Sequence, residues 1–198
     1  MAKVVKFPVP TPEKFGPQRV RKKHPSGSEK HGQLNLFSGG KVIRLNRLSL
    51  FEEALLMDDQ GDRESAKLRY EKAIEAHDST ADAYCNLGIL EFQDGHYPKA
   101  IDCFTRCLRE EPRHFEAHYN LANLYAEVGN FLLAKVHYEI SIEMEPGFSN
   151  SYFNLGLTLA MNKEFKDAVS VLNTYRQLTS EDDHRQVDDL IEKLSAAL

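Results

Sequence analysis

Apolar and small residues recur along this chain with a period of thirty-four residues. The unit 81–114 shows the pattern in nine residues: Tyr84, Leu87, Gly88, Gly95, Tyr97, Ala100, Phe104, Cys107 and Pro112. The next unit, 115–148, has matching residues at the same offsets: His118, Leu121, Ala122, Gly129, Phe131, Ala134, Tyr138, Ser141 and Pro146. A fixed period of this length indicates stacked pairs of helices. We expect the glycine to end the first helix of each pair and the proline to end the second.

The same pattern extends over one unit on each side, 47–80 and 149–182. The first of these departs from it at several places, which is expected of a terminal repeat with one face toward solvent. The last has Lys163 in place of the turn glycine and Ser180 in place of the closing proline. Residues 181–198 then carry an apolar ladder from Val187 to Leu194, which predicts an amphipathic helix that caps the array.

These spacings resemble the tetratricopeptide repeat over about three quarters of the chain. The resemblance implies an all-α, right-handed α-solenoid of four helix pairs (47–80, 81–114, 115–148 and 149–182) plus the capping helix. No strand is required anywhere. Small residues at the eighth place of each unit, such as Gly88 and Gly156, are expected to let the two helices of a pair cross closely.

In tetratricopeptide repeat proteins the first helix of each pair lines a concave groove. The resemblance assigns twelve residues to this groove: Phe51, Glu52, Leu55, Asn86, Ile89, Phe92, Tyr119, Asn120, Asn123, Phe153, Asn154 and Leu157. Such a groove is apolar and aromatic, with a ladder of asparagines and an acidic end near Asp58 and Asp59. Asparagine side chains can hold the backbone of an extended peptide, although asparagine is also the ordinary choice at this place of the repeat. The function implied is a non-catalytic module or adaptor that binds a peptide or protein segment.

Charge divides the chain into a basic tail and an acidic body. Residues 1–46 hold ten Lys/Arg against two Asp/Glu, whereas residues 47–198 hold fifteen against twenty-eight. Prolines, glycines and a shortage of apolar residues predict that the tail is disordered. Its densest basic patch is Arg19, Arg21, Lys22 and Lys23. This patch is interpreted either as part of a solubilising linker or as a contact for phosphate or an acidic surface.

One apolar cluster interrupts the tail, at Gln33, Leu34, Leu36 and Phe37 within the sequence QLNLF. Exposed apolar clusters are typical of docking sites. The pentapeptide resembles the motif by which bacterial replication and repair proteins bind the DNA sliding clamp. Three interpretations stay open: clamp binding, docking within the same chain, and no specific role.

Two functional hypotheses follow from the tail. In the first, the tail occupies the groove of its own chain and is displaced by a partner. The alternative is a nucleic-acid-associated regulator that contacts DNA or the clamp through the basic tail and QLNLF. The repeats also resemble those attached to bacterial MerR-type regulators, although we expect no winged helix before the linker here.

The sequence predicts neither a catalytic site nor a metal site. No nucleophile–base set is evident, so we expect no enzyme activity and no cofactor. His114 and His118 lie four apart but are expected to have core roles, and Cys103 and Cys107 lack a second pair of zinc ligands. No apolar run is long enough for a membrane span or secretory signal. We therefore expect a cytoplasmic protein with reduced thiols, no membrane contact and, given the polar cap, a monomer.

Overall fold

The computed structural model describes residues 17–21, 48–180 and 184–198. Every regular element in this described part is a helix, which confirms the predicted all-α class. The described ranges contain nine helices: α1 Leu50–Asp59, α2 Arg63–Glu75, α3 Thr80–Gln93, α4 Tyr97–Glu110, α5 Phe115–Glu127, α6 Phe131–Met144, α7 Ser149–Met161, α8 Phe165–Leu178 and α9 His184–Ser195.

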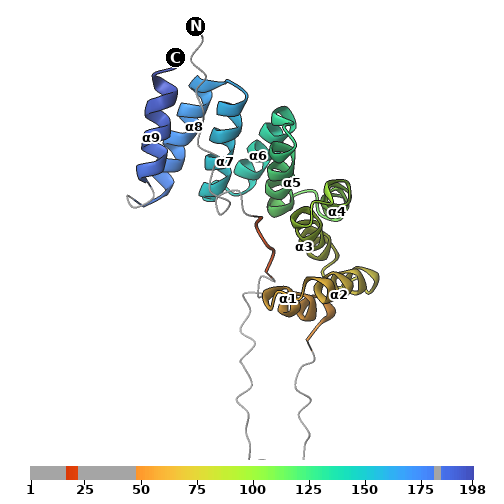
Figure 1. The fold of residues 1–198 in the computed structure, drawn as a ribbon. Helices are drawn as coiled ribbons and strands as arrows, with labels where there is room; N and C mark the ends of the chain where they lie inside the picture. Colours follow the sequence, from red (N-terminus) through yellow and green to blue (C-terminus); the bar gives the residue numbers. More distant parts are fainter. Residues whose placement is uncertain (1–16, 22–47, 181–183) are drawn as a thin grey trace, which may run out of the picture.

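The helices pack as consecutive pairs that stack into a solenoid (Figure 1). The two helices of each pair, α1/α2, α3/α4, α5/α6 and α7/α8, lie against one another, and each pair contacts the next. The first helices of neighbouring pairs also touch, since α3 contacts α5 and α5 contacts α7. Helix α9 packs on α8 at the end of the array. None of the helices in the described part combines the length and apolar composition that crossing a bilayer requires.

A residue with left-handed backbone ends the turn inside each helix pair. Gly61, Gly95 and Gly129 have φ values of 80°, 76° and 78°. Glycine adopts this conformation without steric cost because it has no Cβ. Lys163 takes the equivalent place in the fourth pair with φ 66°, so a side chain is carried there in a strained conformation.

Two glycines permit the closest helix crossings. A Cβ added at Gly88 would lie 2.8 Å from the Phe104 ring, and one added at Gly156 would lie 2.6 Å from Leu172. Phe104 and Leu172 are fully buried, so neither can move aside freely. The sequence predicted that the eighth place of the repeat requires a small residue. At positions 88 and 156 the structure leaves room only for glycine.

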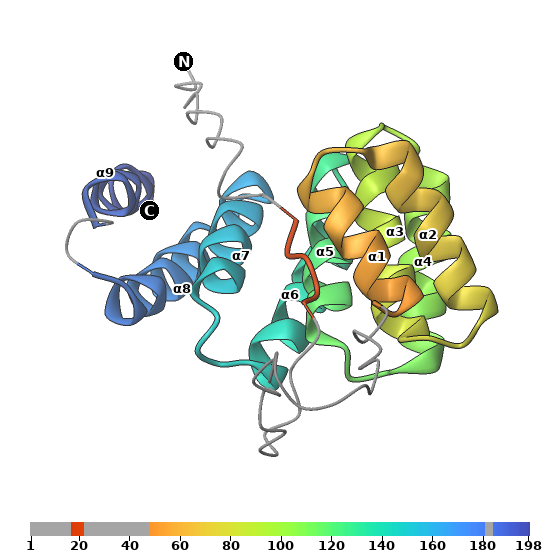
Figure 2. The same cartoon turned by 90° about the horizontal axis from the view of Figure 1, so that it is seen from below.

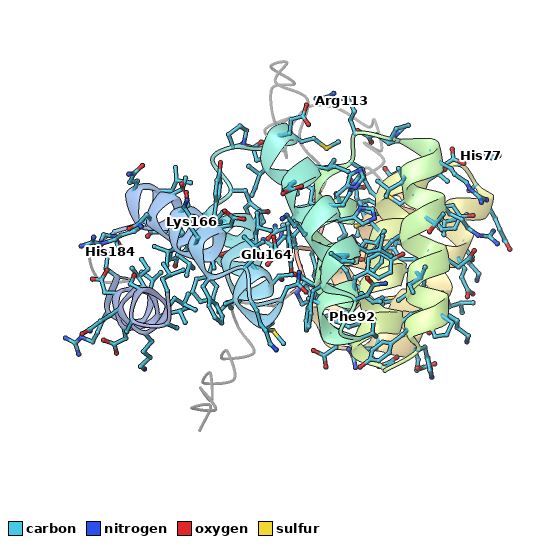
Figure 3. All side chains as sticks on the ribbon, turned by 90° about the horizontal axis from the view of Figure 1, so that it is seen from above. His77, Phe92, Arg113, Glu164, Lys166 and His184 are labelled. Carbon is cyan, nitrogen blue, oxygen red and sulfur yellow. The ribbon has the colours of Figure 1, made fainter. Side chains whose placement is uncertain are left out.

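Polar contacts join the pairs outside the apolar core. Glu164, the residue before α8, accepts a bond from Lys135 of α6, with Nζ 2.6 Å from Oε2. Figure 3 shows Glu164 near the middle of the molecule. In the first half, Lys67 of α2 pairs in the same way with Asp94 at the end of α3, at 2.6 Å.

Residues 17–21 belong to the tail that the sequence predicted to be disordered. They run in extended conformation along the inner face of the solenoid, beside α5 and close to α1 (Figures 1 and 2). We call them the docked segment. The QLNLF motif, Lys22 and Lys23 lie outside the described residues.

Candidate functional site: the concave groove

Two asparagines hold the backbone of the docked segment. Asn86 of α3 accepts a hydrogen bond from the Val20 N–H at 3.0 Å and donates one to the Val20 carbonyl, also at 3.0 Å. Asn120 of α5 repeats this arrangement on Gln18, at 2.8 Å and 2.9 Å. Each amide thus satisfies both backbone groups of one residue, as the donor and acceptor of an asparagine allow.

The spacing of these contacts defines a register of two residues per repeat. In an extended chain the N–H and C=O of one residue point to the same side, and those of the next point to the other side. Gln18 and Val20 therefore face the asparagines, whereas Pro17 and Arg19 direct their backbone groups away. Pro17 has no N–H to lose at that position. The segment runs from the third repeat toward the first, opposite to the order of the repeats.

The Val20 side chain is buried in the space between the second and third repeats. It is 7% exposed and belongs to an apolar cluster with Cys85, Ile89 and Leu121. Burying an aliphatic side chain of this size contributes about 1.5–3 kcal/mol before ordering costs are subtracted. The groove therefore contacts the Val20 side chain as well as the backbone of the segment.

Arg19 connects the segment to the first repeat through two carboxylates of α1. Its Nη2 lies 2.8 Å from Oδ1 of Asp58, and its Nη1 lies 3.7 Å from Oδ1 of Asp59. The Asp58 side chain is only 2% exposed, whereas that of Asp59 is 59% exposed. Burial raises the pKa of Asp58, and the positive charge of Arg19 opposes this shift. The hydroxyl of Tyr70 also donates to Asp58 at 3.4 Å.

Three of the four aromatic residues that the sequence assigned to the groove, Phe51, Tyr119 and Phe153, lie within the core. The rings of Phe51 and Tyr70 are 5.9 Å apart, and those of Tyr119 and Tyr138 are 6.0 Å apart. Phe153 packs on a further tyrosine in the fourth pair. Their burial shows that they pack between helices and repeats, so the contacts of the docked segment come mainly from other residues.

The remaining predicted groove residues fall into three places. Ile89 lies in the Val20 cluster, with Phe92 half-buried at its edge. Leu55 is half-buried on α1, and Leu157 is buried on α7. Glu52 accepts the Ser49 N–H at 2.8 Å and so closes the start of α1. The acidic contacts to the segment come from Asp58 and Asp59.

The asparagine ladder was predicted from the sequence, but with a different tail segment, QLNLF, in the groove. The signal it lacked was the alternation after Pro17, where Val20 is flanked by Arg19 and Arg21. Of the predicted basic patch, Arg19 pairs with carboxylates and Arg21 is exposed. Arg19 is therefore unavailable to phosphate while the segment is docked.

The third asparagine of the ladder, Asn154 of α7, has a different set of partners. Its Nδ2 donates to the Tyr119 hydroxyl and to Oδ1 of Asn123, each at 3.0 Å. The Tyr138 hydroxyl also donates to Oδ1 of Asn123, at 2.6 Å. Burial raises the pKa of Tyr119 to about 12 and also raises the pKa of Tyr138 well above its usual value, so both hydroxyls keep their protons near neutral pH.

Cys85, Cys107 and His114 form a buried cluster behind the groove. Their sulfur and nitrogen atoms lie within 4.8 Å of one another, as metal ligands do. Both nitrogens of His114 are already engaged, since Nδ1 accepts from the Ala117 N–H at 3.1 Å and Nε2 faces Asp82 at 3.1 Å. The imidazole thus has no free lone pair to offer, and the cluster as arranged does not fit a metal ion.

Hydrogen bonds within this cluster shift the pKa values of Cys107 and His114. Hydrogen bonding from Cys85 and then from His114 lowers the pKa of Cys107 to about 7 against the effect of burial. Burial lowers the pKa of His114, but its bonds to Asp82 and Cys107 outweigh this and raise it to about 10. Cys107 is fully buried, so no substrate reaches it in this structure.

Comparison with known proteins identifies the repeats. A tetratricopeptide repeat profile matches residues 81–114, and a second profile of the same description matches residues 103–135 and 137–170. The chain therefore contains tetratricopeptide repeats.

Solved structures share this architecture. MamA matches with 25% sequence identity and a TM-score of 0.61, over 65% of this chain and 75% of MamA. The first tetratricopeptide domain of Spaghetti (RPAP3), bound to the HSP90 peptide SRMEEVD, matches with 20% identity and a TM-score of 0.55, over 59% of this chain and 91% of that domain. The TPR2B domain of yeast Sti1 in complex with an Hsp70 peptide matches with 23% identity and a TM-score of 0.55, over 60% of this chain and 98% of that domain. At these identities the last two show the shared fold alone.

Proposed function

We propose that this protein is a non-catalytic interaction module that binds an extended peptide segment of a partner protein in its concave groove. The observation that carries the proposal is the double hydrogen bond that Asn86 and Asn120 each make to one backbone residue of the docked segment. These bonds recognise an extended backbone of any sequence, and the Val20 cluster and Asp58 add selectivity for side chains. Two structural relatives, Spaghetti (RPAP3) and Sti1, were solved with peptides, which supports the same use of the fold here.

The docked segment would then be an internal ligand that a partner must displace. It uses the backbone contacts, one buried side chain and one ion pair, which together make a complete peptide-binding mode. A partner peptide would compete for the same atoms. The predicted self-docking of the tail thus stands as part of the proposal, with residues 17–21 in the groove.

A binding experiment on the full-length protein tests this function. The probe is a labelled peptide of residues 11–21 of this sequence, TPEKFGPQRVR. The receptor is an opened variant, Arg19→Ser with Val20→Ser, whose own segment has lost its ion pair and its buried side chain. We expect the probe to bind the opened variant at least tenfold more tightly than the wild type, measured by fluorescence anisotropy.

Two further variants locate the binding site. Adding Asn86→Ala and Asn120→Ala to the opened variant should abolish probe binding, because the hydrogen bonds of both asparagines to the peptide backbone are removed. Asn173→Ala is the matched control, since this α8 asparagine bonds to the Val169 carbonyl of its own helix. Failure of the probe to bind the opened variant, or binding that survives loss of Asn86 and Asn120, would contradict the proposed function.

A further inference from the structure

The third and fourth repeats together carry a hydrogen-bonding donor and acceptor that the docked segment, as described, does not use. Asn154 occupies the same place of its repeat as Asn86 and Asn120. Its Oδ1 is buried and has no hydrogen-bond partner among the described residues, and the same holds for Nδ2 of Asn123. Unmade bonds on buried amides are costly, which makes two together a sign of a missing partner.

The orientations of these two amides are fixed by their other bonds. The Tyr138 hydroxyl donates to Oδ1 of Asn123, so the other end of that side chain is the NH2 group. Nδ2 of Asn154 donates to Tyr119 and Asn123, so its other end is the carbonyl. What remains is one acceptor and one donor, the same pair that Asn86 alone presents to Val20.

We propose that Asn154 and Asn123 form a third backbone subsite, which binds the peptide residue two places before the one held by Asn120. Oδ1 of Asn154 accepts the N–H of that residue, and Nδ2 of Asn123 donates to its carbonyl. The proposal rests on the proposed peptide-binding function and extends the register of two residues per repeat to the fourth repeat.

The subsite defines the chemistry of the partner. The ligand is an extended peptide of at least five residues, with its N-terminal end at α7 and its C-terminal end near α1. Its first, third and fifth residues give their backbone groups to the three asparagine subsites. Its fourth residue is an arginine for Asp58, and its fifth is a β-branched aliphatic residue for the Val20 position. The second place accepts proline, as at Pro17, because an N–H at this place would point away from the asparagine ladder and would make no bond to it.

In the numbering of this chain, the first of these five residues is Gly16, which lies outside the described residues. Peptide esters test the subsite without altering the protein, because replacing one backbone N–H by oxygen removes one donor. The parent probe is the peptide 11–21 and the receptor is the opened full-length variant. We expect the ester at Gly16 to bind about 2- to 10-fold more weakly than the parent, the effect of one lost hydrogen bond.

Two comparisons complete the experiment. The ester at Glu13 is the control, since it alters only backbone groups that precede the five residues of the ligand, and its affinity should equal that of the parent. With Asn154→Ala in the receptor, the Gly16 ester and the parent should bind equally, whereas with Asn86→Ala the difference should persist. Equal binding of parent and Gly16 ester to the unaltered groove would overturn the third subsite. Absence of binding by the parent itself would instead overturn the proposed function.

Discussion

Arg19 and Asp58 form the ion pair that ties the docked segment to the first repeat, with Nη2 of the arginine 2.8 Å from Oδ1 of the carboxylate. The Asp58 side chain is almost completely buried, so its charge depends on a close partner. Opposite charges at this distance attract more strongly where one of them is shielded from water. The pair therefore makes Asp58 a sensitive position for controlling whether the segment is docked.

Asp58→Asn should release the segment. The substitution keeps an oxygen for the Tyr70 hydroxyl but removes the charge that holds Arg19. Losing roughly 1.5 kcal/mol should lower docking about tenfold. The readout is hydrogen exchange at the Val20 amide, whose N–H is bonded to Asn86, and its protection should fall by the same factor.

The control for this prediction is Asp102→Asn, which breaks an exposed pair with Arg106 on α4. It should leave the Val20 amide unchanged. Raising the salt concentration should weaken docking in the wild type more than in Asp58→Asn, because screening acts on the ion pair. Unaltered Val20 protection in Asp58→Asn would show that the pair does not hold the segment.

The contact between His118 and His137 should lower the free energy of unfolding as the pH becomes acidic. Their Nδ1 atoms are 2.9 Å apart, and Nε2 of His118 faces the Pro112 carbonyl at 3.3 Å. Burial, and then the neighbouring His118, lower the pKa of His137 from 6.5 to about 4, and burial also lowers that of His118. The unfolded chain therefore binds protons first as pH falls below 6.5, and the free energy of unfolding decreases down to about pH 4, by on the order of 2 kcal/mol.

His137→Gln tests this dependence, because glutamine keeps a donor for His118 but does not titrate. Urea unfolding between pH 7 and about pH 4 should show a smaller loss of stability than in the wild type. The exposed His77, replaced by asparagine, serves as the control and should retain the full loss. Parallel pH profiles for the wild type and His137→Gln would refute the assignment.

Lys163→Gly should stabilise the fold. The lysine has φ 66° at the turn where the other three repeats have glycine. Removing the Cβ relieves the strain, with an expected gain of about 0.5–1 kcal/mol in the free energy of unfolding, although the added flexibility of the unfolded chain offsets part of it. Lys163→Ala keeps a Cβ and should give no comparable gain in urea unfolding, so an equal gain in both variants would point to another cause.

The thiol of Cys107 should ionise near neutral pH in the folded protein. Hydrogen bonding from Cys85 and His114 lowers its pKa to about 7, whereas burial raises that of Cys103 to about 12. The ultraviolet absorbance of a thiolate should therefore rise with a midpoint near pH 7. Cys107→Ser should remove this transition and Cys103→Ser should leave it in place. A transition appearing only at clearly alkaline pH would contradict the pairing with His114.

The helices could be predicted from the sequence because their causes are local and periodic. Gly61, Gly95 and Gly129 mark the turns, and Pro112 and Pro146 follow the ends of α4 and α6. Lysine does not favour a left-handed backbone. This conformation at Lys163 could be predicted only from its place in the repeat, where the other three repeats have glycine.

The docked segment could not be predicted because its contacts span distances along the chain that no local pattern records. Val20 and Asn86 are 66 residues apart, and Gln18 and Asn120 are 102 apart. The asparagine ladder indicated that a backbone would be held. The choice of occupant depends on the fit of one valine and one arginine, whereas the apolar richness of QLNLF drew the prediction to residues 33–37.

Carrying the ligand on the same chain has a consequence for selectivity. Residues 22–47 join the docked segment to the first repeat, so the segment acts on the groove at an effective concentration on the order of millimolar. An incoming peptide with only the same affinity would have to reach that concentration to displace half of it. The protein would thus ignore scarce or loosely fitting sequences and respond to a partner that is abundant or binds more tightly than Gln18–Val20, which sets a threshold for engagement.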